Sequence, residues 1–212
     1  MMWKHLGRAF AIGAIAVAMS TNVALADQHA DQHKGKGGMP PMDANAQAAM
    51  MAEMMKMAGP GPEHKTLEAQ AGKWTTVTKS YMAPGEPAVT KGKAEYELIL
   101  GGRFLMGRFH DVMMGQPFEG FSIMGYDRTA KSYNGYWMGT MGTAVYPMMN
   151  GVWDEATKSM TFNVIWPNPM GGTMPFKMVT TMHGPDSMSF KMTMTHEGKE
   201  MPTTEVDYTR VK

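Results

Sequence analysis

The feature that most constrains the fold is an alternation of apolar and polar residues with a period of two, which continues through most of the chain after residue 72. It is clearest over residues 187–196, where Met188, Phe190 and Met192 alternate with serine and lysine. Such segments form strands with one apolar and one polar face, as in the wall of a barrel or sandwich. The predicted strands are 73–82, 94–100, 103–114, 118–126, 133–141, 144–153, 160–166, 174–183, 187–196 and 201–211.

Glycines recur inside these predicted strands as well as between them. Gly107, Gly120, Gly125, Gly135 and Gly139 all interrupt strand patterns. Interior glycine marks a bulge, a sharp bend or a close backbone approach, which a tightly curved sheet needs. The connections are short, and short connections favour sequential neighbours. We therefore predict an all-β fold, an antiparallel up-and-down β-barrel of about ten strands.

The first 26 residues have the pattern of a Sec-type signal peptide. A positively charged start at 3–8 precedes a short apolar run at 9–18, and Ala24-Leu25-Ala26 supplies the small-x-small cleavage pattern. The apolar run is too short to span a bilayer. We expect cleavage near Ala26 and a periplasmic or secreted protein without a transmembrane segment. The chain has no cysteine, so no disulfide stabilises it.

Two further segments precede the predicted barrel. Residues 27–42 form a polar, histidine-containing tail that is expected to be disordered. Asp43 is a plausible N-cap, and 44–58 is rich in Ala, Met, Gln, Glu and Lys, which favour helix. The prolines and glycines of 59–62 end this helix. We therefore assign 43–62 to a methionine-rich helix with its linker and 63–212 to the barrel domain.

The ends of the predicted barrel carry a recognisable pair. Gly72-Lys73-Trp74 begins the first strand, and Arg210 lies near the end of the last. This resembles the signature of the calycins, the lipocalins and fatty-acid-binding proteins, in which an arginine from the end of the chain covers the tryptophan of a Gly-x-Trp. A guanidinium stacked on an indole would seal one end of the barrel and tie the terminal strands together.

A longer set of motifs resembles the bacterial family known as domain of unknown function 1579 (DUF1579). The resemblance spans about residues 60–212 and implies a calycin-like β-barrel. It implies no activity, because the family is named for lacking an assigned one. The matching motifs lie at 60–65, 71–74, 100–104, 114–120, 125–127, 136–137 and 208–210.

A barrel of this size either holds a small ligand or is filled by side chains. The first alternative predicts an exported, non-catalytic binding protein for a small hydrophobic molecule, since methionine adapts to irregular apolar ligands. The second predicts a closed core, and the sequence leaves both open. The candidate lining residues are Trp137, Phe176, Phe190, Met192 and Met194.

Methionine, at 28 residues, supports an alternative function. Thioether sulfur selects soft ions such as Cu(I) or silver, and exposed methionine also consumes oxidants. A new N-terminus with histidine in third place would offer a square-planar nitrogen set for Cu(II). Copper is thus the only cofactor that we consider. The candidate metal residues are Asp27, Gln28, His29 and His33 in the tail and Met50, Met51, Met54 and Met55 on the helix.

Other functional classes find little support. The net charge is +1 and no basic run follows the signal segment, so nucleic acid is not an expected partner. No nucleophile, phosphate-loop or metalloprotease motif is present, and we predict no enzyme. His110 and Asp111 are neighbours on a strand and should point to opposite faces. By the same parity, at most one of Arg103 and Arg108 points inward to hold a ligand carboxylate. The sequence does not set the oligomeric state, and a partner that binds the methionine-rich helix stays open.

Overall fold

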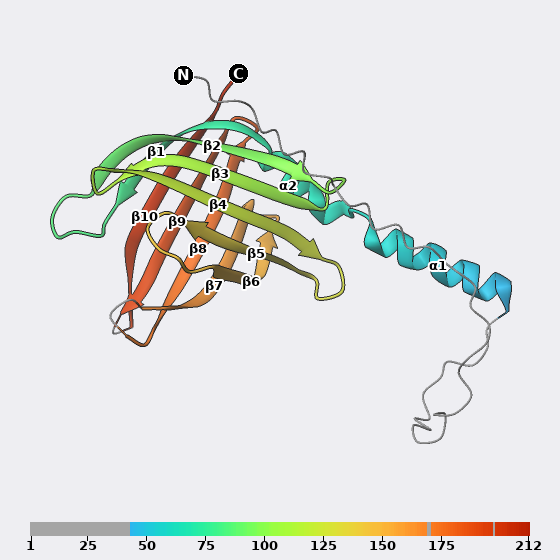
Figure 1. Ribbon diagram of the computed structural model, residues 1–212. Coiled ribbons are helices and arrows are strands. Elements are labelled where there is room, and N and C mark those ends of the chain that lie inside the picture. Colours follow the sequence, from blue (N-terminus) through green and yellow to red (C-terminus); the bar gives the residue numbers. More distant parts are fainter. Residues whose placement is uncertain (1–42, 169–170, 197) are drawn as a thin grey trace, which may run out of the picture. The chain divides into compact units, whose positions relative to one another are not determined.

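The computed structural model describes residues 43–168, 171–196 and 198–212 and consists of three short helices followed by ten strands (Figure 1). The helices are α1 (Ala44–Ala58), the 3-10 helix η1 (Pro62–His64) and α2 (Lys65–Gln70). The strands are β1 (Gly72–Ser80), β2 (Ala88–Ile99), β3 (Phe104–Met113), β4 (Gln116–Asp127), β5 (Ser132–Gly139), β6 (Tyr146–Asp154), β7 (Ser159–Pro167), β8 (Thr173–Gly184), β9 (Ser187–His196) and β10 (Lys199–Arg210).

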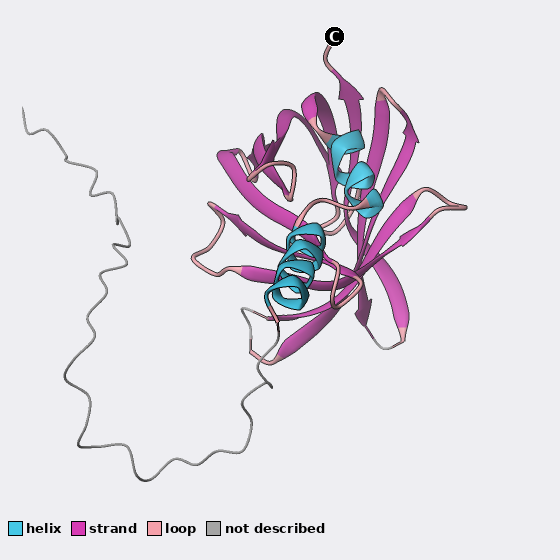
Figure 2. Cartoon of the chain, turned by 90° about the vertical axis from the view of Figure 1, so that its right-hand side faces the viewer, coloured by secondary structure: helices cyan, strands magenta, loops and turns pink. Residues whose placement is uncertain are grey.

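The ten strands form a closed antiparallel barrel. Each strand pairs with the next along the chain, and β1 pairs with β10 to close the ring. In that closing pair, Trp74 lies opposite Arg210 and Ser80 lies opposite Thr204. Figure 2 shows the magenta strands arranged around one axis. This confirms the predicted all-β, up-and-down barrel of about ten strands with a preceding helix.

The strand that differs most from its prediction is β2, which begins at Ala88 rather than at residue 94. Its first half pairs with β1 from Ser80 opposite Ala88 to Thr75 opposite Lys93. The inward-facing residues of this half are alanine, threonine and glycine. The alternation of large apolar and polar residues that marks a strand is therefore missing there.

Helix α1 has the bounds expected from its helix-forming residues, and none of its residues is buried. Its last turn is held by two arginines of the barrel: Arg103 Nε donates to Ala58 O at 2.8 Å, and Arg128 donates to Lys56 O at 2.9 Å. Positive side chains at a helix C-terminus satisfy its free carbonyls. Among the helices that the structure describes, none combines the length and apolar character needed to cross a bilayer.

Helix α2 was not predicted, and it anchors the core at one end of the barrel. Leu67 on α2 is completely buried and packs with Leu105, Met160 and Phe162 from the barrel interior. We call this end, where β1 begins and β10 finishes, the sealed end. The opposite end, where β1 finishes and β10 begins, is called the far end. Methionines fill much of the core, since Met148, Met160, Met178 and Met188 are all buried.

Candidate functional site

The sealed end is closed by a contact between the terminal strands. Trp74 is 1% exposed, and the Arg210 guanidinium lies 4.1 Å from the centre of its ring. Arg210 also donates to Pro185 O at 2.6 Å and to Ala69 O at 2.8 Å. Gly72 has a φ of +131°, and a Cβ there would collide with the guanidinium. We call this arrangement the Trp74–Arg210 clasp. It closes one end of the interior to solvent.

All five predicted lining residues lie on strands β5, β8 and β9, and their side chains take the inward positions. Phe176 pairs with Met194 across β8 and β9, and Met192 pairs with the buried Met178. Trp137, Phe176, Phe190 and Met192 pack against the main core, yet these four side chains and that of Met194 are only half-buried. The structure thus brings the predicted set to one interior surface toward the far end.

Two aromatic residues that the prediction omitted belong to the same surface. Trp166 on β7 lies 5.4 Å from Phe176 and 4.9 Å from Tyr146 on β6, between ring centroids. Trp166 follows Met160, Phe162 and Val164 at a spacing of two, so the alternation could have identified it. We call the inward side chains of Trp137, Tyr146, Trp166, Phe176, Phe190, Met192 and Met194 the apolar wall.

Polar side chains also point inward, on β1 and at one position of β3 near the far end. Thr78 Oγ1 donates to Asp111 Oδ2 at 2.7 Å, and the Val112 amide donates to Asp111 Oδ1 at 2.7 Å. Gly92 on β2 makes room between them, because a Cβ there would lie 2.9 Å from Thr76 Oγ1 and 3.0 Å from Asp111 Cγ. We call Thr76, Thr78 and Asp111 the polar strip. Sequence reasoning missed it.

The two neighbours His110 and Asp111 point to opposite faces, so they form no catalytic pair. His110 is exposed on the outside, with Nδ1 4.0 Å from Glu119 Oε1 of β4. Neither Arg103 nor Arg108 points inward. Arg103 holds α1, and Arg108 is exposed and lies 5.7 Å from the centre of the Phe121 ring on the outer face.

Two tyrosines lie beside the polar strip. Tyr96 and Tyr208 are packed with their ring centroids 6.4 Å apart. Burial raises the pKa of the Tyr208 hydroxyl to about 12, while its hydrogen bond with Tyr96 opposes this rise and the negative charge of Asp111 adds to it. Burial likewise raises the pKa of Tyr96 well above its usual value. The carboxylate of Asp111 therefore acts electrostatically inside the barrel.

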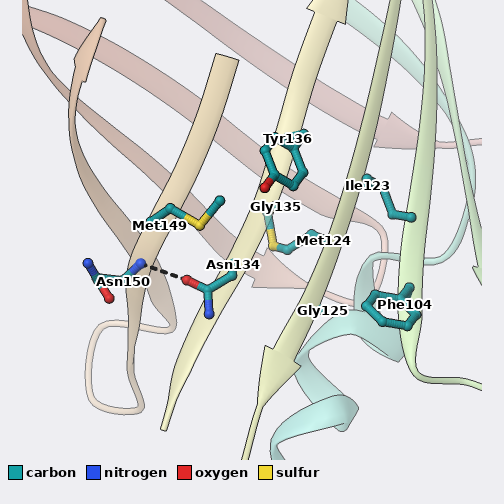
Figure 3. Close-up of a pocket in the computed structure, with 9 residues that line it drawn as sticks. All are labelled: Phe104, Ile123, Met124, Gly125, Asn134, Gly135, Tyr136, Met149 and Asn150. Atoms are coloured by element: carbon teal, nitrogen blue, oxygen red, sulfur yellow. Dashed lines mark hydrogen bonds between the residues drawn. The ribbon is translucent and has the colours of Figure 1, made fainter. Parts of the chain in front are cut away.

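A second concave surface lies on the outside of the barrel, over β3 to β6 (Figure 3). It encloses about 590 Å³ between Phe104, Ile123, Tyr136 and Met149. At its edge the Asn150 amide donates to Asn134 Oδ1 at 2.9 Å. We call it the outer groove. None of the five predicted lining residues borders it.

The structure describes the candidate metal residues of the helix but not those of the tail. Asp27, Gln28, His29 and His33 lie outside the described residues. Met51, Met54 and Met55 on α1 are between 55% and 67% exposed, and Met50 is 36% exposed. No three histidine, aspartate or glutamate side chains gather as metal ligands in the described part of the chain.

Comparison with solved structures places the fold among calycin-like barrels. The S-type phycobiliprotein lyase CPES from Guillardia theta is 10% identical, with a TM-score of 0.51, over 74% of this chain and 97% of the lyase. Rv2717c from M. tuberculosis is 12% identical, also with a TM-score of 0.51, over 72% of this chain and 99% of Rv2717c. At these identities the likeness shows the fold alone. A comparison with curated proteins finds no match.

A family model covers η1, α2 and the whole barrel. The family is described as "Protein of unknown function (DUF1579)", and its model matches residues 59–210. The match begins after α1 and ends on Arg210 of the clasp, so it contains the apolar wall and the polar strip. This chain belongs to the DUF1579 family.

Proposed function

We propose that this chain is an exported, non-catalytic binding protein that holds a small apolar molecule in its barrel, with the apolar wall as the binding surface. The observation that carries the proposal is that the side chains of the apolar wall point inward, yet all of them except the buried Trp166 are only half-buried. Apolar side chains that fill a core are normally buried completely. The Trp74–Arg210 clasp closes the opposite end, so a ligand would enter from the far end.

A saturation experiment with a neutral, environment-sensitive dye such as Nile red tests this proposal. We expect one dye molecule per chain and displacement by unlabelled apolar compounds. Phe176→Gln should weaken dye binding about tenfold, because it places an amide against the bound apolar molecule. Ile165→Gln is the matched control, since Ile165 lies on the neighbouring strand and is 69% exposed on the outside. It should leave dye binding unchanged.

A third variant separates the interior from the outer groove. Tyr136 lines the outer groove and is exposed. If Tyr136→Gln weakens dye binding and Phe176→Gln does not, the ligand binds outside the barrel and the proposal is wrong. Absence of saturable binding by the folded protein would contradict it as well. Circular dichroism of each variant establishes that it is folded.

A second candidate function rests on α1. Its methionines are exposed and none of its residues is buried, so the thioether groups are accessible to solvent. We propose as the alternative that this helix, with the histidine tail, binds soft metal ions or consumes oxidants in the periplasm. The test is a titration with Ag(I) and Cu(I). Replacement of Met50, Met51, Met54 and Met55 by leucine should abolish binding to the helix while the barrel stays folded.

The tail site needs a separate measurement, because it depends on where the signal peptide is cleaved. Mass spectrometry of protein purified from its own host reports the natural N-terminus together with any retained ligand or metal. A Cu(II) titration of that protein should then give a visible d–d band at about one equivalent if Asp27 is the first residue. No such band would exclude the tail site and leave the helix site unaffected.

A further inference from the structure

We infer that the ligand of this barrel is an apolar molecule with a cationic, hydrogen-bond-donating group at one end, such as a protonated long-chain amine, and that Asp111 binds this group. The inference rests on the proposed function and specifies its ligand class. Its basis is the distribution of charge inside the barrel and the placement of the polar strip across from the apolar wall.

Within the described strands, the barrel interior contains a carboxylate and no basic side chain that pairs with it. Asp111 is the only charged residue at the inward positions of the ten described strands, apart from Arg210 in the clasp and the exposed His196 and Lys199 at the far rim. Arg103 and Arg108, which could have held a ligand carboxylate, both lie outside. The interior is therefore suited to a cation and unfavourable to an anion.

The two hydrogen bonds to Asp111 leave its negative charge uncompensated. Its partners are the Thr78 hydroxyl and the Val112 amide, which are both neutral. No described lysine, arginine or histidine forms an ion pair with Asp111. Each carboxylate oxygen still has a free lone pair, so Asp111 can accept further hydrogen bonds. A charge in such a half-buried site is stabilised by a cationic donor more than by a neutral one.

The position of Asp111 sets how the ligand would lie. Asp111 is two residues from the end of β3, so it lies near the far end, through which a ligand would enter. The apolar wall is formed by β5 to β9, while the polar strip is on β1 and β3. A molecule with its amine on Asp111 can place its apolar body against Phe176 and Trp166. A ligand with one charged end and one apolar chain can therefore contact the polar strip and the apolar wall together.

Three probes of equal chain length test the inference: decylamine, decanol and decanoate, each titrated calorimetrically at neutral pH below its micelle concentration. We expect decylamine to bind about tenfold or more tightly than decanol, the scale of one charge-assisted hydrogen bond, and decanoate to bind most weakly. Asp111→Asn should lower the affinity for decylamine to about that for decanol, because it removes the negative charge but keeps an oxygen that can accept from Thr78. Asp207→Asn is the matched control, an exposed aspartate on β10.

The possible results distinguish this inference from the proposed function. Equal binding of the three probes, or tightest binding of decanoate, would overturn the inference and leave the apolar binding function intact. An amine preference that survives in Asp111→Asn would also overturn it, since a group other than Asp111 would then bind the ammonium group. If none of the probes binds in a saturable way, the proposed function fails together with the inference. An amine preference that Asp111→Asn alone removes supports both.

Discussion

Replacing Arg210 tests the physical basis of barrel closure. Its guanidinium covers the indole of Trp74, and it donates hydrogen bonds to the carbonyl oxygens of Pro185, Ala71 and Ala69. It thereby joins the last strand to the segment that enters the first strand and to the turn between β8 and β9. Arg210→Ala removes all of these contacts at once and exposes to water the indole of Trp74, which is almost fully buried in the wild type.

The magnitude follows from the individual contacts. The stacking on Trp74 is worth about 0.5–2 kcal/mol, and each net hydrogen bond contributes about 0.5–1.5 kcal/mol. Because the Arg210 side chain is 23% exposed, water partly replaces these interactions in the variant. We expect a loss of about 3 kcal/mol in the free energy of unfolding. The ion pair with Asp186, 3.7 Å away and half-exposed, should contribute about 0–1 kcal/mol.

The assay is urea unfolding of wild type, Arg210→Ala, Arg210→Lys and Asp186→Asn, followed by tryptophan fluorescence. Lysine keeps the charge but not the planar fork, so we expect Arg210→Lys to lose about half as much free energy as the alanine variant. Asp186→Asn should lie within about 1 kcal/mol of wild type. A loss below about 1 kcal/mol for Arg210→Ala, or an equal loss for Asp186→Asn, would refute the clasp as the stabilising contact.

Three further predictions follow from buried or exposed groups. The pKa of Tyr208 is raised to about 12, so the folded state favours its neutral form, and this contribution to the free energy of unfolding is complete below about pH 10. The contribution is lost as the pH rises toward 12, which urea unfolding at stepped alkaline pH will measure. Gly151→Ala should cost about 1–3 kcal/mol, because the new methyl group would overlap the Phe162 ring, and thermal unfolding will show it. Dilute peroxide should oxidise the methionines of α1 before Met160 and Met188, which are 2% and 1% exposed, as peptide mass spectrometry can determine.

The barrel could be predicted because its signals are local. Strand β9 has the bounds expected from Met188 to Met194, since a period of two needs only neighbouring residues. Helix α1 likewise follows from helix-forming residues and the prolines after it. Helix α2 could not be found in this way, because its six residues are too short to show a helical period. Its position depends on the burial of Leu67 by distant strands.

The sequence predicted the apolar part of the candidate site but not its polar part. Alternation correctly assigns the inward face of β8 and β9, which carries Phe176 and Phe190. The polar strip depends on register instead: Thr78 and Asp111 are 33 residues apart and meet across β2, where Gly92 leaves space for both. No local pattern encodes that meeting. The extent of burial also depends on how ten strands curve together, so the sequence could not decide between a filled and an open interior.

The clasp has a consequence for how the chain is made. Arg210 donates to Ala71 across a separation of 139 residues, and the pairing of β1 with β10 is the last that translation makes available. Until then, the indole of Trp74 has no cover, and nine emerging strands have two unpaired edges that invite association with other chains. An incomplete chain of this kind would depend on rapid pairing of its last strand, or on a chaperone, to escape aggregation.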